Sequence, residues 1–346
     1  MASRRRRRFP LPVLAAAGLA VFAVWPRLRA ELPPPPAGQV RATPIALPPE
    51  DPARGRLGSL RYLGGIEMEA ADPRFGGLSD LRVSTDGRRL VAVSDCGYGF
   101  SANLELDENG APRGLSLPRL VDLAGPGGRA LLVGENDAES LVWDGDHLEV
   151  GFEGRGRVWR YAAEPPFSPP VAPVPTPVGL VLCGSNMGLE TMARLDGERR
   201  LLVCEGEKFP SLTVPAWIGG PGAWTERRYP LHFGGGWLGE PYRPTGAARL
   251  PSGDVLVSER RFPPFGSRIV RLSRGEVDGR GPLAPVEIAN LGGSALADNY
   301  EGIDVRRDER GRTIVYLVSD DNSCAKPGGS RFAVARTRLL AFELLD

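Results

Sequence analysis

Leu-Glu-Thr-Met-Ala-Arg-Leu-Asp-Gly-Glu-Arg-Arg-Leu-Leu-Val-Cys-Glu, residues 189–205, is the clearest copy of a segment that recurs five times in the chain. Two short apolar stretches flank an Asp-Gly dipeptide, a pattern that is typical of a β-hairpin. Acidic residues stand at both ends of the segment, Glu190 at its beginning and Glu205 at its end. Because an antiparallel hairpin brings its ends together, we expect these two side chains to be neighbours in space.

The five copies follow one another at regular intervals. Their opening residues are Ser79, Glu139, Glu190, Thr245 and Glu301, separated by 60, 51, 55 and 56 residues. Repeats of this length that each hold several short strands predict an all-β chain folded as a β-propeller of five to six blades. Five blades can be counted, and a degenerate sixth is left open. A β-sandwich with similar hairpins is the alternative, but it gives no reason for acids to recur at equivalent ends.

Further strands are expected after each hairpin, where β-branched or aromatic residues alternate with polar ones. The predicted third strands are Ser101–Asp107, Arg157–Ala162 and Ser267–Leu272, and the predicted fourth strands are Leu115–Leu123 and Leu283–Ala289. The proline-rich run that begins at Ala163 is expected to be an exposed connection, because proline lacks a ladder donor. A closed ring leaves no bare sheet edge. We therefore expect Leu57–Met68 to lie as an outer strand beside Thr337–Leu344.

The 346 residues divide into three parts. Residues 1–30 hold five arginines before the uncharged run Phe9–Trp25, which predicts a signal peptide or a retained signal anchor; a cytoplasmic protein with a basic tail is the alternative. The run of 17 residues is at the lower limit for crossing a bilayer. Residues 31–55 are rich in proline and predict an extended linker, and 56–346 are the expected propeller domain. The protein is thus predicted to be periplasmic or otherwise extracytoplasmic, either free or held to the inner membrane by residues 9–25.

Charge and cysteine content restrict the partners. The formal net charge is +1, so the chain offers no overall field for nucleic acid. We expect a monomer that meets a membrane only through its N-terminal segment and acts on a small molecule. With two histidines and no Cys-x-x-Cys pair, a zinc cage is not expected. The repeat geometry suggests the disulfides Cys183–Cys204 and Cys96–Cys324, with four free thiols as the alternative.

Acidic residues dominate the ends of the copies. In a propeller these ends share one face of the ring, at the mouth of the central channel. The acids expected there are Asp95, Glu139, Glu153, Glu190, Glu205, Glu259, Glu301 and Asp320. Such a cluster raises the pKa of its members and needs a neutralising partner. Ca²⁺, which takes six to eight oxygen ligands, is one candidate, and the chain's own arginines are the other. Pairing of each acid with a local arginine, purely to fix the blades, is the structural alternative.

The same residues resemble the family called esterase-like activity of phytase. The most specific matches are Asn299-Tyr-Glu-Gly302 and Leu317-Val-Ser-Asp-Asp-Asn322. The other matching stretches are Phe75-Gly-Gly-Leu-Ser79, Val93-Ser-Asp95, Asp137-Ala-Glu139, Phe152-Glu153, Leu189-Glu190, Pro244-Thr-Gly246 and Ser258-Glu-Arg-Arg-Phe262. The resemblance implies a repeated domain whose acids carry phosphoesterase or phosphodiesterase chemistry. The chain departs from the family at Cys96 and at Gly154-Arg155, where the family often has arginine directly after the acid.

These observations lead to one functional hypothesis and two rivals. The hypothesis is an exported, metal-dependent hydrolase of phosphoric monoesters or diesters. Ca²⁺ would be held by Glu139, Glu190, Glu301 and Asp95. The general base would come from Glu153, Glu205, Glu259 or Asp320, and the substrate would be bound by Arg260, Arg261, Lys208 and Asn322. The rivals are a non-catalytic, calcium-stabilised binding module and a lactonase-like hydrolase. A Ser-His-Asp hydrolase is not expected, because the chain has no Gly-x-Ser-x-Gly.

Overall fold

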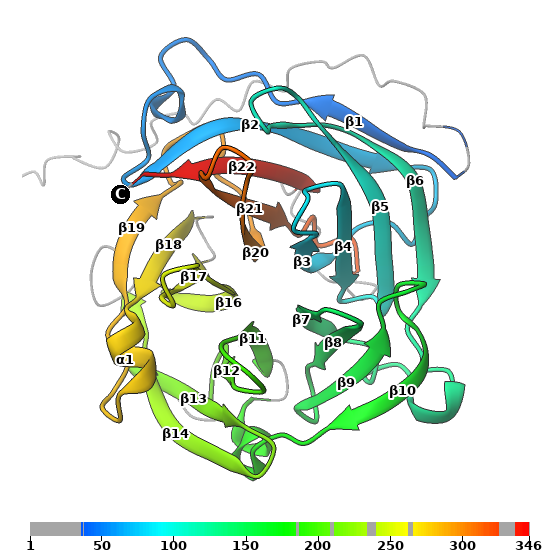
Figure 1. The fold of residues 1–346 in the computed structure, drawn as a ribbon, viewed down its shortest axis with the longest axis vertical. Coiled ribbons are helices and arrows are strands. Elements are labelled where there is room, and N and C mark those ends of the chain that lie inside the picture. Colours follow the sequence, from blue (N-terminus) through cyan, green and yellow to red (C-terminus); the bar gives the residue numbers. More distant parts are fainter. Residues whose placement is uncertain are drawn as a thin grey trace, which may run out of the picture. The chain divides into compact units, whose positions relative to one another are not determined.

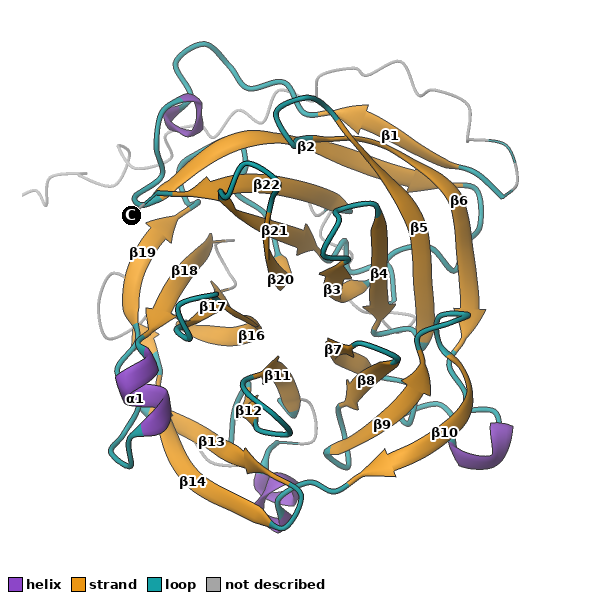
Figure 2. Ribbon diagram, viewed as in Figure 1, coloured by secondary structure: helices purple, strands orange, loops and turns teal. Residues whose placement is uncertain are grey.

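The chain forms a five-bladed β-propeller (Figure 1). The computed structural model describes residues 36, 38–184, 187–207, 211–233, 240–261, 266–324 and 336–345. Over these residues the strands form five antiparallel sheets around a central axis. Strands make up almost the whole ring, and the few helical turns lie in its outer connections (Figure 2). The all-β propeller is therefore confirmed, with a blade count of five.

Blades 1 to 4 run from the central channel outwards in chain order. Blade 1 is β3 (Leu78–Val83), β4 (Arg89–Ser94), β5 (Tyr98–Leu106) and β6 (Pro112–Asp122). Blade 2 is β7 (Ala138–Asp144), β8 (His147–Phe152), β9 (Arg157–Ala162) and β10 (Ser168–Val174). Blade 3 is β11 (Leu189–Arg194), β12 (Arg200–Cys204), β13 (Thr213–Gly220) and β14 (Ala223–Pro230). Blade 4 is β16 (Pro241–Arg249), β17 (Val255–Arg261), β18 (Gly266–Leu272) and β19 (Val286–Asn290), with the short β15 (His232–Phe233) paired to β16.

The fifth blade joins the two ends of the described chain. It consists of β20 (Tyr300–Arg307), β21 (Thr313–Ser319), β22 (Arg338–Leu344), β2 (Leu60–Ala70) and β1 (Val40–Pro44). The predicted closure is confirmed, because β2 pairs antiparallel with β22 along its length. Strand β1 lies within the segment expected to be a linker. It pairs with β2 because its alternating residues fit the open edge of that strand.

Short helical turns occur only in connections: η1 (Pro52–Arg54), η2 (Pro126–Gly128), η3 (Val178–Leu182) and α1 (Arg274–Asp278). One further correction concerns the proline-rich run after Ala163, which was expected to be a connection. Its second half enters β10, the outermost strand of blade 2. The prolines are accommodated there because an edge strand has one side without ladder partners.

The core is divided into five apolar clusters, one at each boundary between blades. Leu81 of blade 1 and Leu339 of blade 5 belong to one cluster, and Val203 of blade 3 and Val257 of blade 4 belong to another. Each sheet thus buries both of its faces against neighbouring sheets.

A buried ion pair ties the five innermost strands together at the middle of the channel. Asp80 and Arg82 both lie on β3, with a distance of 2.9 Å between Arg82 Nη1 and Asp80 Oδ1. Asp80 Oδ2 accepts a hydrogen bond from the Leu141 N–H on β7. Arg82 also donates to backbone carbonyls of three other blades, those of Met192 on β11, Ala247 on β16 and Ile303 on β20. We call this pair the channel plug, because it crosses the axis between the two ends of the inner strands.

Candidate functional site: an acidic channel mouth

A β-bulge marks the opening residue of every copy. The register of each inner hairpin slips by one residue at Ser79, Glu139, Glu190, Thr245 and Glu301. A bulge leaves the extra residue outside the ladder and redirects its side chain. The five opening residues are therefore equivalent in structure as well as in sequence.

The closing positions form a second ring, and the register shows that blade 4 differs. In blades 1, 2, 3 and 5 the residue before the bulge pairs with a residue of the second strand, and the acid directly follows that partner in sequence. In blade 4 the residue before the bulge is Pro244, and its partner is Glu259 itself. The position equivalent to the acids is therefore that of Arg260. The closing ring is therefore Asp95, Glu153, Glu205, Arg260 and Asp320.

Both rings open into one cavity of about 660 Å³ at this end of the channel. Its charged lining consists of Asp95, Asp137, Glu139, Glu153, Glu190, Glu205, Arg260, Glu301 and Asp320. Eight carboxyl groups thus share the cavity with one guanidinium. Seven of the eight acids predicted from the sequence are brought together there.

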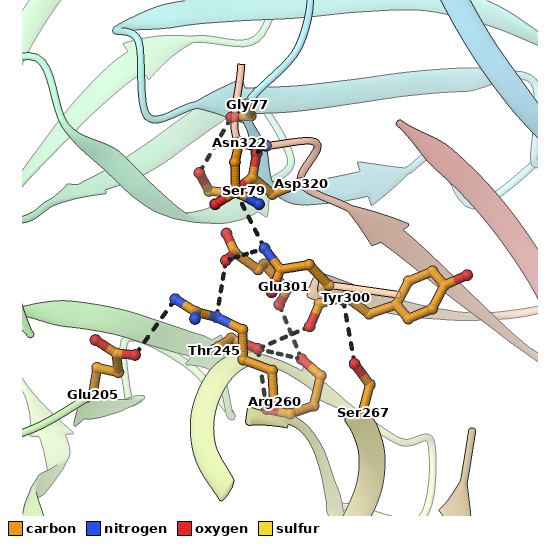
Figure 3. A network of polar contacts seen from close by, with 12 residues as sticks. Gly77, Ser79, Glu205, Thr245, Arg260, Ser267, Tyr300, Glu301, Asp320 and Asn322 are labelled. Atoms are coloured by element: carbon orange, nitrogen blue, oxygen red, sulfur yellow. Dashed lines mark hydrogen bonds and ion pairs between the residues drawn. The ribbon is translucent and has the colours of Figure 1, made fainter. Parts of the chain in front are cut away.

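Arg260 lies between the two halves of the cavity (Figure 3). Its Nε is 2.9 Å from Glu301 Oε1, and its Nη2 is 3.4 Å from Glu205 Oε1. Burial opposes the charge of Arg260, but the attraction of Glu301, Glu205 and Glu190 outweighs burial and raises the pKa of the guanidinium. This residue accordingly stays charged and neutralises part of the mouth.

The part of the mouth beyond Glu301 is organised by amide donors (Figure 3). The side-chain amide of Asn299 donates to Glu301 Oε1 at 3.0 Å and to Asp320 Oδ2 at 3.3 Å. The backbone N–H of Asn322 donates to Asp320 Oδ1 at 2.7 Å. These contacts hold Glu301 and Asp320 side by side, although their charges repel.

On the other side of Arg260, three carboxyl groups converge. Glu153 Oε1 accepts a 2.8 Å hydrogen bond from the N–H of Gly188, which draws this side chain from blade 2 to blade 3. As a result Glu153, Glu190 and Glu205 each present an oxygen within 4.8 Å of the others. We call these three residues the glutamate trio.

Burial and mutual repulsion raise the pKa values of the mouth. Burial is the largest cause for Asp95 and for Glu153, and the pKa of each rises to about 8. For Glu139 and Glu190, burial and the neighbouring carboxylates, first Glu190 and Glu205 respectively, raise the pKa well above its usual range. The site therefore holds protons near neutral pH when nothing else neutralises it.

The structure corrects one predicted site residue and adds another. Glu259 lies outside the cavity, where its carboxylate accepts hydrogen bonds from the Tyr229 hydroxyl at 2.6 Å and from Arg268 Nε at 2.5 Å. Its strand position points it to the boundary between blades 3 and 4 rather than into the channel. Asp137, which was not predicted, lines the cavity, two residues before the bulge at Glu139.

The predicted substrate-binding residues are only partly brought together. Arg260 and Asn322 line the cavity. The guanidinium of Arg261 instead lies 4.9 Å from the centre of the Tyr242 ring, because neighbouring residues of a strand face opposite sides. Lys208 lies outside the described residues.

Both predicted disulfides are present. Cys96 and Cys324 join blades 1 and 5 with a Cα–Cα distance of 5.3 Å, and Cys183 and Cys204 are joined at 5.8 Å. Cys96 and Cys324 also line the cavity. The first bridge thus fixes the segment that carries Asp320 and Asn322 to the blade that carries Asp95.

Fold and site together define a five-bladed propeller with an acid-lined channel mouth. The chain belongs to the Phytase-like family, whose description is "Esterase-like activity of phytase" and which matches residues 73–323. No curated protein matches the chain. No helix within the described residues is long and apolar enough to span a bilayer.

Solved structures similar to the chain include propellers of several kinds. The WD40 repeats of RRP9 are 10% identical, with a TM-score of 0.43 over 91% of this chain and 100% of that one. U3-55K is 12% identical, with a TM-score of 0.42 over 89% and 99%. The PQQ-bound aldose sugar dehydrogenase of Streptomyces coelicolor is 15% identical, with a TM-score of 0.39 over 90% and 99%. The fold assignment itself depends on the strand order given above.

Proposed function

We propose that the protein is an exported hydrolase of phosphoric monoesters or diesters that works with a bound Ca²⁺ ion at the acidic mouth. Membership of the phytase-like family supports the reaction class. The observation that carries the proposal is the cavity in which eight carboxyl groups meet a single arginine. Among the described residues, most of these acids have no cationic partner, so contacts that fix the blades do not explain them.

The donor set fits a hard cation. The oxygen donors that line the cavity are carboxylates and the side-chain amides of Asn136 and Asn322, which suit Ca²⁺ rather than a softer metal. Cys96 and Cys324 offer no thiolate, because they are joined to each other. Asp95 Oδ1 is buried and accepts no hydrogen bond from the described residues. The glutamate trio would hold the ion, and Asp95, Glu139 and Glu301 offer further oxygens on the same cavity.

A cation bound there would supply Lewis acidity toward a phosphoryl oxygen and help to polarise a water molecule. The chain's own residues would bind the ester and move protons. A phosphate group can replace Glu205 and Glu301 as the partner of the Arg260 guanidinium, through paired, charge-assisted hydrogen bonds. Asp320, whose pKa is raised well above its usual range by burial and by the neighbouring Glu301, would hold a proton that can be passed to a leaving oxygen at neutral pH.

Export is part of the proposal and draws support from the cysteines. Four of four cysteines are paired in two disulfides. Such bridges persist in oxidising compartments such as the periplasm. The apolar run Phe9–Trp25, which would direct export, lies outside the described residues.

The test is turnover by the purified full chain on a panel of phosphomonoesters and phosphodiesters, with and without added Ca²⁺ after passage over a chelating resin. The proposal expects calcium-dependent hydrolysis that Glu190→Gln abolishes. Glu226→Gln, the same change at an exposed position of β14, serves as the matched control and should keep full activity. Calcium-dependent stabilisation without any turnover would instead identify a binding module, and hydrolysis of lactones alone would identify the lactonase-like rival.

A further inference from the structure

The end of the channel opposite the acidic mouth holds a second cavity, of about 620 Å³. It lies where the inner strands end and the hairpin turns begin. All five blades contribute, through Arg82, Trp143, Arg194, Arg249 and Arg306. We call it the arginine chamber.

The charge of this chamber is the reverse of that at the acidic mouth. Its lining contains five arginines, the fifth being Arg307, and one acid, Asp304. That acid is already engaged, because Asp304 Oδ2 accepts a 2.7 Å hydrogen bond from the N–H of Val83. The lining therefore has an excess of positive charge that its own carboxylate does not balance.

Several of the arginines keep donor groups unused. Arg194 pairs with Asp144 at 2.7 Å, and the buried Arg306 donates its Nε to the Tyr316 hydroxyl at 3.0 Å. Arg307 donates its Nε to the Gly311 carbonyl at 3.1 Å. Arg249 is half-buried, and within the described part of the chain its guanidinium contacts no acceptor. The donors of Arg249 are therefore available to an anion that enters the cavity.

The channel plug separates the arginine chamber from the acidic mouth. Arg82 forms part of the chamber lining and is held by the carbonyls of three other blades. The ion pair of Asp80 and Arg82 lies between the chamber and the acidic mouth and is bonded to the other four inner strands. A ligand in the chamber is thus separated from the proposed reaction centre.

We propose that the arginine chamber binds a small organic anion with at least two negative charges, of the phosphate or carboxylate class. Arginine suits such oxyanions because its planar fork donates two parallel hydrogen bonds. Arg249 of blade 4 and Arg306 and Arg307 of the adjacent blade 5 all line the chamber. Trp143, Leu195 and Leu250 provide an apolar wall for the organic part of the ligand. The inference does not depend on the proposed hydrolase activity.

The experiment is calorimetric titration of the full chain, freed of metal on a resin, with pyrophosphate and with citrate as separate probes. Metal-free protein is used because the acidic mouth then repels both anions. The chamber predicts saturable binding of one anion per chain. Arg249→Ala and Arg307→Ala should each weaken it roughly tenfold or more. The two probes show whether phosphate or carboxylate is preferred.

Two variants serve as controls. Arg310→Ala removes the same charge from an exposed turn at this end of the channel but outside the cavity lining, and Arg260→Ala removes the arginine of the opposite mouth. Both should bind the probes as tightly as the wild-type chain. Absence of saturable binding, or equal weakening by Arg310→Ala and Arg249→Ala, would overturn the proposal. Thermal melts of all variants establish that each is folded.

Discussion

All five blades share the same bulge, but they carry different side chains on it. Blades 2, 3 and 5 have a glutamate there, whereas blades 1 and 4 have a serine or a threonine. Glu139, Glu190 and Glu301 extend into the acidic cavity. Thr245 instead contacts its own blade and the next one, where its hydroxyl lies 3.3 Å from the Ser258 carbonyl and 3.4 Å from the Tyr300 carbonyl. Ser79 likewise donates to the Gly77 carbonyl. The bulge is therefore a property of the fold, and the carboxylate placed on it is a property of the site.

The largest effect is expected when a glutamate blade is converted to the threonine type. Glu190→Thr should lower turnover by about 10²-fold or more, because it removes a ligand of an ion whose Lewis acidity is worth several kcal/mol. The metal-free variant should melt at an equal or higher temperature than wild type, because a buried group under repulsion from Glu205 has been removed. Turnover and melting curves on the same preparation check both expectations. A variant that is inactive because it is unfolded would contradict the separation of bulge and carboxylate.

The reverse conversion should damage the fold. Thr245→Glu removes the contacts of a fully buried hydroxyl and places a charge beside the carbonyls of Ser258 and Tyr300. We expect the free energy of unfolding to fall by about 3 kcal/mol, as for an uncompensated buried charge. Denaturant unfolding measures this loss, with Thr245→Val as the uncharged control of similar shape. Unchanged stability together with tighter Ca²⁺ binding would show that blade 4 can also serve the site.

A smaller effect is expected from pH on the metal-free protein. The pKa of Glu153 is raised from 4.5 to about 8 in the folded state, chiefly by burial. The folded state therefore binds more protons than the unfolded state between these values. Stability should fall as pH rises from 5 to 8, by up to about 1.4 kcal/mol per pH unit for such a carboxyl. Melting curves across this range test the sign, and Ca²⁺ should flatten the profile. A metal-free protein that gains stability over the same range would contradict the buried, repelling cluster.

The smallest effect should come from Ser79→Ala. Its single 3.4 Å contact with the Gly77 carbonyl is weak, and Ser79 does not line the cavity. Turnover should stay within a factor of two, and stability should change by about 0.5 kcal/mol. Parallel assay with Glu139→Ala, the equivalent change in blade 2, gives the matched contrast. A loss of activity as large as that of Glu139→Ala would mean that the hydroxyl blades belong to the site.

The sequence predicted the elements that carry a repeated signal. Inner hairpins, their shared ends and the pairing of the two outer segments follow from apolar alternation, turn residues and spacing. The strands β13 and β14 were not predicted, because the sequence that precedes them does not resemble the equivalent part of the other copies. Strand β1 was missed because prolines on both sides resemble a spacer, whereas the free edge of β2 decides its conformation.

The site was predicted in composition but not in detail. Glu259 follows a serine as Asp95 does, and that likeness suggested that both face the channel. Only the strand register shows that Arg260 takes the equivalent place. The glutamate trio was not foreseen either, because the hydrogen bond from Gly188 to Glu153 crosses between blades. Contacts between blades cannot be predicted from the spacing of residues within one copy.

The pairing of β2 with β22 also sets a limit on how the protein can be made. Arg61 and Glu343, which are joined across this pair, are 282 residues apart in sequence. A chain emerging from the ribosome can therefore assemble four blades early but must wait for its last strand before the fifth is whole. Until then β2 has no partner on the side that β22 occupies.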